Sequence, residues 1–292
     1  MNIHFATLIS RRYWTPETLL LAKSLRSFGG EFADLPITAF HPKGQDLSSE
    51  TAVEAKQLGI QLAEYTIPEA AGDFPLGFIP FGAAAAEAHL AQQCDLLIWQ
   101  LPDTLILAPP TDFALPEEKT LAYRPVHHQN VGSTFSQPPD AFWQLIYRHT
   151  EVPDDRLFRM ITCYQEEVRP YFNAGILAVR PRSGILRQWA KVFERTFQHP
   201  DFTPFFEEQR YAIFMHQAIL VGVILHLLAP EELVCLPESY NYPLHMHTGY
   251  PVDGKVSRLA ELVTARYENT LELPEFIQPF EDAKSVLGLL NS

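Results

Sequence analysis

Short apolar segments alternate with amphipathic ones along the first third of the chain. Three segments are rich in β-forming residues and bounded by polar or turn residues, which predicts strands: residues 3–9 (IHFATLI), 36–40 (PITAF) and 60–65 (IQLAEY). The segment 14–30 predicts a helix, because Thr15 suits the N-cap, Pro16 suits the first helical position and Gly29 suits the end.

Three further segments continue this pattern. Residues 48–59 predict a helix that one of two serines caps and a glycine ends. Residues 82–93 (GAAAAEAHLAQQ) have high helix propensity and lead directly into an apolar strand at 94–99 (CDLLIW). The alternation over the first ~105 residues predicts βα units on a mostly parallel sheet, in which ligands bind at the carboxyl ends of the strands.

The rest of the chain is less regular. Residues 109–170 are rich in proline, histidine and aromatic residues, and within them the stretch 123–143 (YRPVHHQNVGSTFSQPPDAFW) reads as loop before a short helix. A strand follows at 171–181 (YFNAGILAVRP), interrupted by Asn-Ala-Gly, then a helix at 183–197 and a largely apolar, buried helix at 207–228. Because no clean boundary is visible, we expect one domain over 1–292, with a regular first half at about 1–108 and a less regular second half at about 109–292.

Composition narrows the classes of partner. The chain carries 22 basic and 35 acidic residues, and its formal charge of −13 opposes attraction to nucleic acid or anionic lipid. No apolar run reaches the roughly 20 residues of a membrane span, and the first residues lack a secretory pattern. The three cysteines, Cys94, Cys163 and Cys235, are far apart. We therefore expect a cytoplasmic protein with no nucleic-acid partner and no membrane span.

Four stretches carry a resemblance to a known family. In chain order they are 5–25 (FATLISRRYWTPETLLLAKSL), 94–107 (CDLLIWQLPDTLIL), 171–181 (YFNAGILAVRP), and HQAIL at 216–220 with LPESYNYP at 236–243. Together they resemble the nucleotide-sugar glycosyltransferases of the A-type fold, particularly the retaining family of glycogenin and the bacterial lipopolysaccharide galactosyltransferases. The stretch 171–181 is the most specific of the four, and the resemblance covers about positions 3 to 245.

The resemblance implies both a fold and a reaction. The fold is a Rossmann-like α/β fold, with a mixed or mostly parallel sheet flanked by helices. The reaction moves a hexose from a nucleotide diphosphate sugar, with a uridine diphosphate sugar as the expected donor, to an unidentified acceptor. A second hypothesis is a non-catalytic nucleotide- or glycan-binding protein on the same fold.

The resemblance also implies roles for individual residues. The nucleotide site would contain Thr7, Tyr13 and Asp103. The donor sugar would lie against Asn173, Ala174, Gly175, His216 and Gln217. The catalytic residues would be Gln217, Asn173 and Asp103.

Each role has a structural alternative. Asn173 offers an amide and Gly175 permits close approach to the backbone, but both also suit a β-bulge. Tyr13 would cover the base, or it is an amphipathic surface aromatic. Gln217 lies near the reactive sugar carbon in the family, or it is a satisfied polar residue inside a buried helix.

The metal-binding motif departs from the family pattern. Leu101 stands where the first metal carboxylate belongs, and Asp103 stands where the second belongs. A hard divalent cation needs several oxygen ligands, so we expect Mn²⁺ or Mg²⁺ to bind weakly or not at all. His216 replaces the family's Asp, and residues 82–93 lack the family's basic residue. If residues 262–269 form the late strand, Tyr267 replaces its metal-binding histidine.

Other side chains could take over the missing charge. His245 and His247 are two positions apart, so in an extended segment both would face one side and could bind a metal or a diphosphate. The alternative is a pair of half-exposed loop histidines. Arg180 and Lys255 are further cationic candidates, whereas the adjacent His127 and His128 have less support. Leu101 favours the binding protein, and the joint presence of Asp103, Asn173 and Gln217 favours the enzyme.

Overall fold

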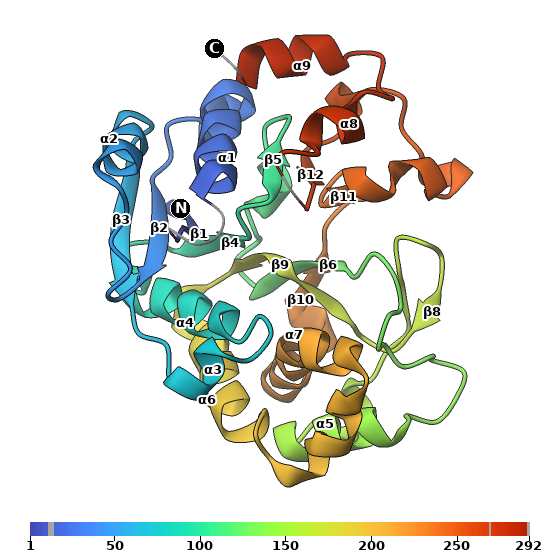
Figure 1. The fold of residues 1–292 in the computed structure, drawn as a ribbon. Helices are drawn as coiled ribbons and strands as arrows, with labels where there is room; N and C mark the ends of the chain where they lie inside the picture. Colours follow the sequence, from blue (N-terminus) through green and yellow to red (C-terminus); the bar gives the residue numbers. More distant parts are fainter. Residues whose placement is uncertain (11–14, 269, 291–292) are drawn as a thin grey trace.

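The computed structural model describes residues 1–10, 15–268 and 270–290, and its central feature is one large twisted sheet (Figure 1). Seven strands lie in the order β10-β6-β9-β4-β1-β2-β3. Their bounds are β1 Ile3–Leu8, β2 Ile37–Pro42, β3 Ile60–Tyr65, β4 Leu96–Gln100, β6 Leu121–Pro125, β9 Phe172–Val179 and β10 Leu233–Cys235. The sheet confirms the expected α/β class.

The sheet is mixed. β1 is parallel to β2 and β4, β2 is parallel to β3, and β10 is parallel to β6. β9 runs antiparallel between β4 and β6. Its pairing with β6 shifts register between Tyr123 and Pro125, opposite the Asn-Ala-Gly segment. As a result, the start of β9 lies next to the end of β4, at the edge where parallel sheets bind ligands.

Helices cover both faces of the sheet (Figure 1). One face packs on α1 (Thr15–Phe28) and α2 (Ser49–Gln57). The other packs on a helical layer with a larger apolar core. This layer comprises α3 (Glu69–Gly72), α4 (Phe78–Leu90), α5 (Ala141–Thr150), α6 (Ile185–Thr196) and α7 (Gln209–Leu227).

Most expected elements are confirmed, but a buried strand replaces part of an expected loop. Ser48 Oγ accepts a hydrogen bond from Thr51 N at 3.1 Å and caps α2, and Gly59 follows this helix with φ of +69°. The expectation of loop from residue 123 is wrong at residues 123–125, which belong to the buried strand β6. This short strand exists because it pairs with β9 and β10, which is a tertiary contact that its own sequence does not display.

A second, three-stranded sheet connects the C-terminal region to the large sheet. Its order is β11-β12-β5, with bounds β5 Thr104–Ile106, β11 Tyr242–Pro243 and β12 Thr264–Arg266. α8 (Leu273–Ile277) and α9 (Ala283–Leu290) belong to this part, and the short β7 (Met160–Ile161) and β8 (Glu167–Val168) form a separate pair. Because β12 is antiparallel to β5, Arg266 is paired with Thr104, directly after the end of β4.

In the part of the chain that the structure describes, one helix, α7, has a length and composition that would allow a membrane crossing. Its central residues are buried, and it packs against α5, α6 and β9. These contacts are those of a core helix, as expected from its uniformly apolar sequence.

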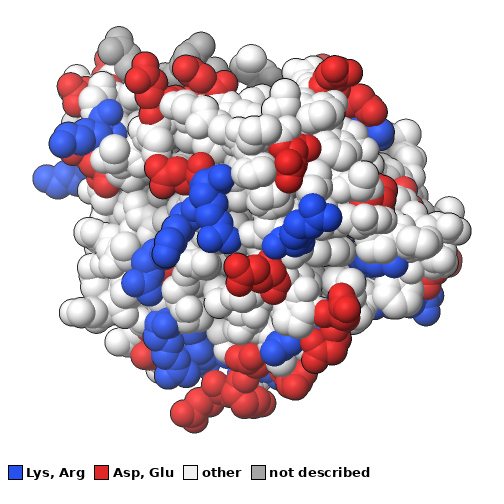
Figure 2. Space-filling model, turned by 90° about the horizontal axis from the view of Figure 1, so that it is seen from below, with Lys and Arg blue, Asp and Glu red and all other residues white. Residues whose placement is uncertain are grey.

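Acidic and basic side chains are interspersed on the face seen from below (Figure 2). Blue groups on this face lie next to red ones, and no broad basic area forms there. This face therefore lacks the clustered positive charge with which proteins recognise a nucleic-acid backbone.

The buried carboxylate of Glu87 links α4 and α6, which both belong to the helical layer with the larger apolar core. Glu87 on α4 is fully buried and accepts hydrogen bonds from Leu186 N, Arg187 N and Arg187 Nε at 3.3, 2.9 and 3.0 Å. Gly184 precedes α6 and provides no side-chain cap, so Glu87 satisfies the first N–H groups of this helix from a distance.

We predict that Glu87→Ala lowers the free energy of unfolding by about 2 to 4 kcal/mol, because it leaves buried N–H groups and a guanidinium without their acceptor. Urea denaturation monitored by circular dichroism measures this. The exposed Glu194 on α6 supplies a control, and Glu194→Ala should change stability by less than about 0.5 kcal/mol. Equal stability of the two variants would contradict the capping role.

Candidate active site at the ends of β4 and β9

A cleft of about 540 Å³ opens where β4 ends and β9 begins. This volume falls within the usual range for a small-molecule site. Many of the residues singled out in the sequence line it, among them Asp103, Asn173, Ala174, Gly175, His216, Gln217 and His245. The fold therefore gathers residues from four separate segments at one place.

The strand ends fix the spacing of the cleft. Leu101 N donates to Gly175 O at 2.9 Å, which continues the antiparallel pairing of β4 and β9 beyond Gln100. The chain then turns at Pro102 and presents Asp103. This confirms that the end of the 96–101 strand and the Asn-Ala-Gly segment are adjacent at one edge of a cleft.

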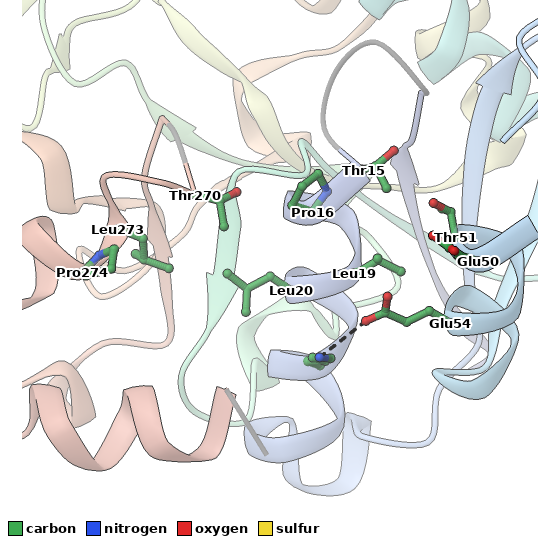
Figure 3. A pocket seen from close by; sticks show the side chains of 11 residues that line it. Thr15, Pro16, Leu19, Leu20, Glu50, Thr51, Glu54, Thr270, Leu273 and Pro274 are labelled. Carbon is green, nitrogen blue, oxygen red and sulfur yellow. Dashed lines mark ion pairs between the residues drawn. The ribbon is translucent and has the colours of Figure 1, made fainter. Parts of the chain in front are cut away.

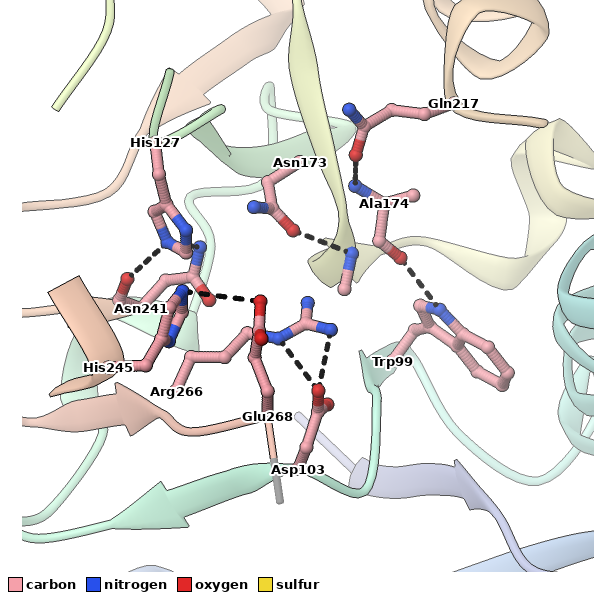
Figure 4. A network of polar contacts seen from close by, with 11 residues as sticks. Trp99, Asp103, His127, Asn173, Ala174, Gln217, Asn241, His245, Arg266 and Glu268 are labelled. Atoms are coloured by element: carbon pink, nitrogen blue, oxygen red, sulfur yellow. Dashed lines mark hydrogen bonds and ion pairs between the residues drawn. The ribbon is translucent and has the colours of Figure 1, made fainter. Parts of the chain in front are cut away.

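The Asn-Ala-Gly segment is held by neighbouring side chains (Figure 4). Gln217 Oε1, on α7, accepts from Ala174 N at 3.0 Å, and Trp99 Nε1 donates to Ala174 O at 3.2 Å. Asn173 Oδ1 accepts from Gly175 N at 2.9 Å. For Asn173 Nδ2 there is no hydrogen bond among the described residues, so this amide donor remains available to a ligand in the cleft.

An ion pair occupies the floor of the cleft. Arg266 donates from Nη2 and Nε to Asp103 Oδ2 at 2.8 and 3.2 Å, and Figure 4 shows the two side chains facing each other. Tyr267 N also donates to Asp103 O at 3.0 Å. Burial raises the pKa of Asp103, and the guanidinium of Arg266 opposes that shift. The second oxygen, Oδ1, is buried without a hydrogen-bond partner among the described residues.

Gly175 makes room for the guanidinium. A Cβ atom on Gly175 would lie 1.9 Å from Arg266 Nη1 and 3.1 Å from its Cζ. Both atoms belong to the planar end of the side chain, so any larger residue at this position would displace Arg266. Glycine is therefore needed at position 175 because of its contact with Arg266, which the sequence alone does not reveal.

The residues around Asp103 do not form a ligand set for a divalent cation. Mn²⁺ or Mg²⁺ takes about six oxygen ligands. Leu101 offers none, and Oδ2 of Asp103 already accepts from a permanent cation 2.8 Å away. Among the described residues, the side chains that meet the distances of a three-ligand metal cluster are His149, His199 and Asp201, which do not line the cleft.

Three histidines of the cleft, His127, His216 and His245, are held in the neutral form. Desolvation, with the charge of Arg266 as a smaller contribution, lowers the pKa of His127 to about 3. Burial is also the largest cause that lowers the pKa of His216, to about 4, and the pKa of His245. These side chains can therefore donate or accept hydrogen bonds near pH 7, but they supply little positive charge.

The expected pairing of His245 and His247 is wrong. Residues 244–249 form a 3₁₀ helix instead of an extended segment, so side chains two apart point in different directions. His245 lines the cleft, with Nε2 3.5 Å from Glu268 Oε1. His247 is buried elsewhere, with Nδ1 2.9 Å from the Tyr242 hydroxyl and its ring 4.3 Å from that of Phe280.

The other cationic candidates also lie outside the cleft. Arg180, near the far end of β9, donates to the carbonyl oxygens of Lys119, Leu115 and Pro116. Lys255 is on the surface and donates to Thr248 O at 3.2 Å. Both side chains therefore bind backbone carbonyl oxygens away from the cleft and stabilise the fold.

The nucleotide candidates have mixed outcomes. Thr7 is fully buried on β1, and its Oγ1 has no partner among the described residues. Tyr13 lies outside the described residues. Ala6 of β1 pairs with Trp99 of the parallel strand β4, so the next residue, Thr7, lies beside Gln100. Both amide atoms of Gln100 are likewise buried without a partner in the described part of the chain.

A second pocket, of about 490 Å³, lies between α1, α2 and the segment around α8 (Figure 3). Its lining includes Pro16, Leu19 and Leu273, and a surface ion pair joins Lys23 and Glu54 at 3.5 Å. It contains none of the predicted site residues and has fewer convergent polar groups than the cleft. We therefore assign the chemistry to the cleft.

Sequence reasoning missed Arg266 and Glu268. Both line the cleft, and both flank Tyr267, the residue considered as the substitute for the family's late histidine. Side chains alternate along a strand, so a buried Tyr267 directs its neighbours to the other face. That alternation was the available signal.

Solved structures share this fold at low sequence identity. The galactosyltransferase LgtC in complex with donor and acceptor sugar analogs is 16% identical, with 100% of this chain and 95% of that chain covered and a TM-score of 0.52. The glycosyltransferase GlyE of Streptococcus pneumoniae is 15% identical, with 100% and 62% covered and a TM-score of 0.52. The apo structure of the bifunctional WbbM is 10% identical, with 100% and 52% covered and a TM-score of 0.53. No curated protein sequence gives a significant match.

The mixed sheet, the position of its cleft and these likenesses define an A-type glycosyltransferase fold. A family described as the Rhodobacterales glycosyltransferase domain matches residues 7–227. The chain belongs to this family, and the protein is a transferase enzyme that acts on glycosyl groups.

The buried histidines predict a dependence of stability on pH. Burial lowers the pKa of His216 and of His4 to about 4, so the unfolded chain binds more protons than the folded one between pH 4 and 6.5. Stability should be fully present above about pH 6.5 and fall as the pH drops toward 4, by about 2 kcal/mol for His216 at pH 4.5 and by less for His4, whose charge solvent screens in part.

Urea titrations at several pH values test this prediction. His4→Gln keeps a hydrogen-bonding group beside Thr38 Oγ1, which lies 2.8 Å from His4 Nε2. It should lose less stability than the native protein between pH 6.5 and 4.5. Identical slopes in the two proteins would show that His4 is protonated equally in the folded and unfolded states.

Proposed function

We propose that the protein transfers a hexose from a nucleotide diphosphate sugar, with uridine diphosphate sugars as the donor class, to an acceptor still to be identified. The observation that carries the proposal is the meeting of Asp103, the Asn173–Gly175 segment and Gln217 in one cleft of about 540 Å³. Strand ends of the sheet supply Asp103 and the Asn173–Gly175 segment, and α7 supplies Gln217, which agrees with the position of ligand sites in this fold class.

Unpaired polar atoms beside the cleft support a nucleotide ligand. Buried polar groups in proteins normally have hydrogen-bond partners. The Thr7 hydroxyl and the Gln100 amide lack them among the described residues, and they lie on neighbouring strands that lead to the cleft. A base or a ribose hydroxyl would supply the missing donors and acceptors.

The donor sugar would lie between β9 and α7. The free amide donor of Asn173 would bind a sugar hydroxyl, and the backbone at Gly175 can approach the ligand closely. Gln217 is fixed by Ala174 N at 3.0 Å and therefore presents its amide to the cleft in one orientation. Such preorganised dipoles stabilise charge that develops on the sugar during transfer.

Domain organisation and compartment remain part of the proposal. We treat residues 1–292 as one cytoplasmic domain in which the first half binds the nucleotide and the second half binds the donor sugar and the acceptor. Limited proteolysis that releases a stable, folded fragment ending near residue 108 would argue against a single unit.

A panel of nucleotide sugars tests the activity. Released nucleotide is measured with each donor, without and with candidate acceptor glycans. Turnover of at least one donor supports the transferase. Nucleotide or glycan binding without turnover of any donor would favour a protein that binds these ligands without catalysis, and no binding of either would contradict the assignment of the cleft.

Asn173→Asp separates the chemistry from the fold. The aspartate keeps an oxygen for Gly175 N but lacks the amide donor, so kcat/KM should fall by about 30- to 1,000-fold. Asn130, on the exposed rim of the same cleft, gives a matched control, because Asn130→Asp makes the same change of charge without that contact. An equal loss in the two variants would remove Asn173 from the site.

A further inference from the structure

We propose that the guanidinium of Arg266 does the work of a divalent cation, holding the diphosphate of the donor and stabilising it as it departs. The inference rests on the proposed function, because it concerns the same cleft and the same donor. It predicts a transferase whose nucleotide affinity and turnover do not depend on metal.

The first support is the position of Arg266. Asp103 would hold a metal through its carboxylate, and here the same carboxylate accepts two hydrogen bonds from Arg266. Leu101, which replaces the other expected ligand, is buried at 4% exposure. The residue set thus suits a guanidinium better than a divalent ion, because a cation with its own N–H donors needs one carboxylate where a metal needs several oxygen ligands.

The second support is the space made for this side chain. Nη1 of Arg266 lies where a Cβ on residue 175 would be, at 1.9 Å. The guanidinium therefore reaches the Asn-Ala-Gly segment, against which the donor sugar is proposed to lie. A group that bridges Asp103 and Gly175 is suitably placed to contact the diphosphate next to that sugar.

The third support is the charge of the cleft. Among the described residues that line the cleft, one has a lysine or arginine side chain, Arg266, and two have acidic side chains, Asp103 and Glu268. Burial lowers the pKa of His127, His216 and His245, so these residues do not replace the cation near neutral pH. A diphosphate in this cleft therefore has the guanidinium of Arg266 as its lysine or arginine partner among the described lining residues.

The fourth support is the number of donors that remain. A guanidinium has five N–H groups in a planar fork. Two of them, one each on Nε and Nη2, point to Asp103 Oδ2. For Nη1 the described residues provide no hydrogen bond, so this edge can receive phosphate oxygens. Asp103 is then a positioning residue that orients Arg266.

The reaction balances without a metal. The bond between the anomeric carbon and the phosphate oxygen breaks, and its electron pair remains on that oxygen. A bond from the acceptor hydroxyl oxygen to the anomeric carbon forms, and the hydroxyl proton passes to the departing diphosphate. Arg266 N–H groups stabilise the charge that grows on the phosphate oxygens.

Calorimetric titration with uridine diphosphate tests the inference. The native protein should bind with the same affinity in EDTA and in MnCl₂. Arg266→Ala should bind uridine diphosphate about 10- to 100-fold more weakly, as for the loss of charge-assisted hydrogen bonds. Its affinity for uridine, which has no phosphate, should stay within about threefold, and a low, non-denaturing concentration of guanidinium chloride should restore part of the lost affinity.

Further variants separate this role from a structural one. Arg266→Ala leaves a buried carboxylate unpaired, so the double variant Asp103→Asn with Arg266→Gln provides a folded comparison without either charge. It should keep a cooperative thermal transition and still lose diphosphate affinity. The double variant Leu101→Asp with Arg266→Ala restores two carboxylates and removes the guanidinium, and its binding of uridine diphosphate should then require manganese.

These outcomes distinguish the role of Arg266 from the proposed transferase function. If the native protein binds uridine diphosphate only with manganese, or if folded Arg266→Ala binds as tightly as native protein, the role of Arg266 is overturned and the transferase assignment stands. If no nucleotide sugar or nucleotide binds under any condition, the proposed function itself fails.

Discussion

The ion pair between Asp103 and Arg266 links the two sheets of this protein at the point where the cleft forms. Asp103 follows β4 of the large sheet, and Arg266 ends β12 of the small one. The antiparallel register of β12 with β5 sets Arg266 opposite Thr104, and Tyr267 N adds a backbone bond to Asp103 O. A buried pair of this kind persists only when both charges have partners, so the surrounding strands must hold it in place.

The pair also determines the electrostatics of the cleft. Arg266 is one of the causes that lower the pKa of His127, His216 and His245, after desolvation in each case. The cleft therefore combines the guanidinium of Arg266, the neutral imidazoles of these three histidines and the amides of Asn173 and Gln217. Such a set recognises a substrate with an anionic end and a hydroxylated end. The proposed nucleotide-sugar donor has this character, and the family match identifies the protein as a glycosyltransferase with the A-type fold.

Local sequence rules were sufficient for much of the fold and for part of the site. The caps of α2 and the apolar strands β1 to β4 depend on neighbours a few residues away, so the sequence displays their causes. β6 was read as loop because its stability comes from β9 and β10. His247 was misplaced because a 3₁₀ helix replaced the assumed extended segment. Arg266 was missed because its partner lies 163 positions away, and only the pairing of β12 with β5 brings them together.

The most direct test of the central claim is a crystal structure of the protein with uridine diphosphate and manganese, with diffraction data collected at the manganese absorption edge. The account predicts diphosphate oxygens within hydrogen-bond distance of Arg266, with the ion pair to Asp103 kept and no anomalous peak beside Asp103. An anomalous peak between Asp103 and the diphosphate, with Arg266 moved out of the cleft, would contradict it.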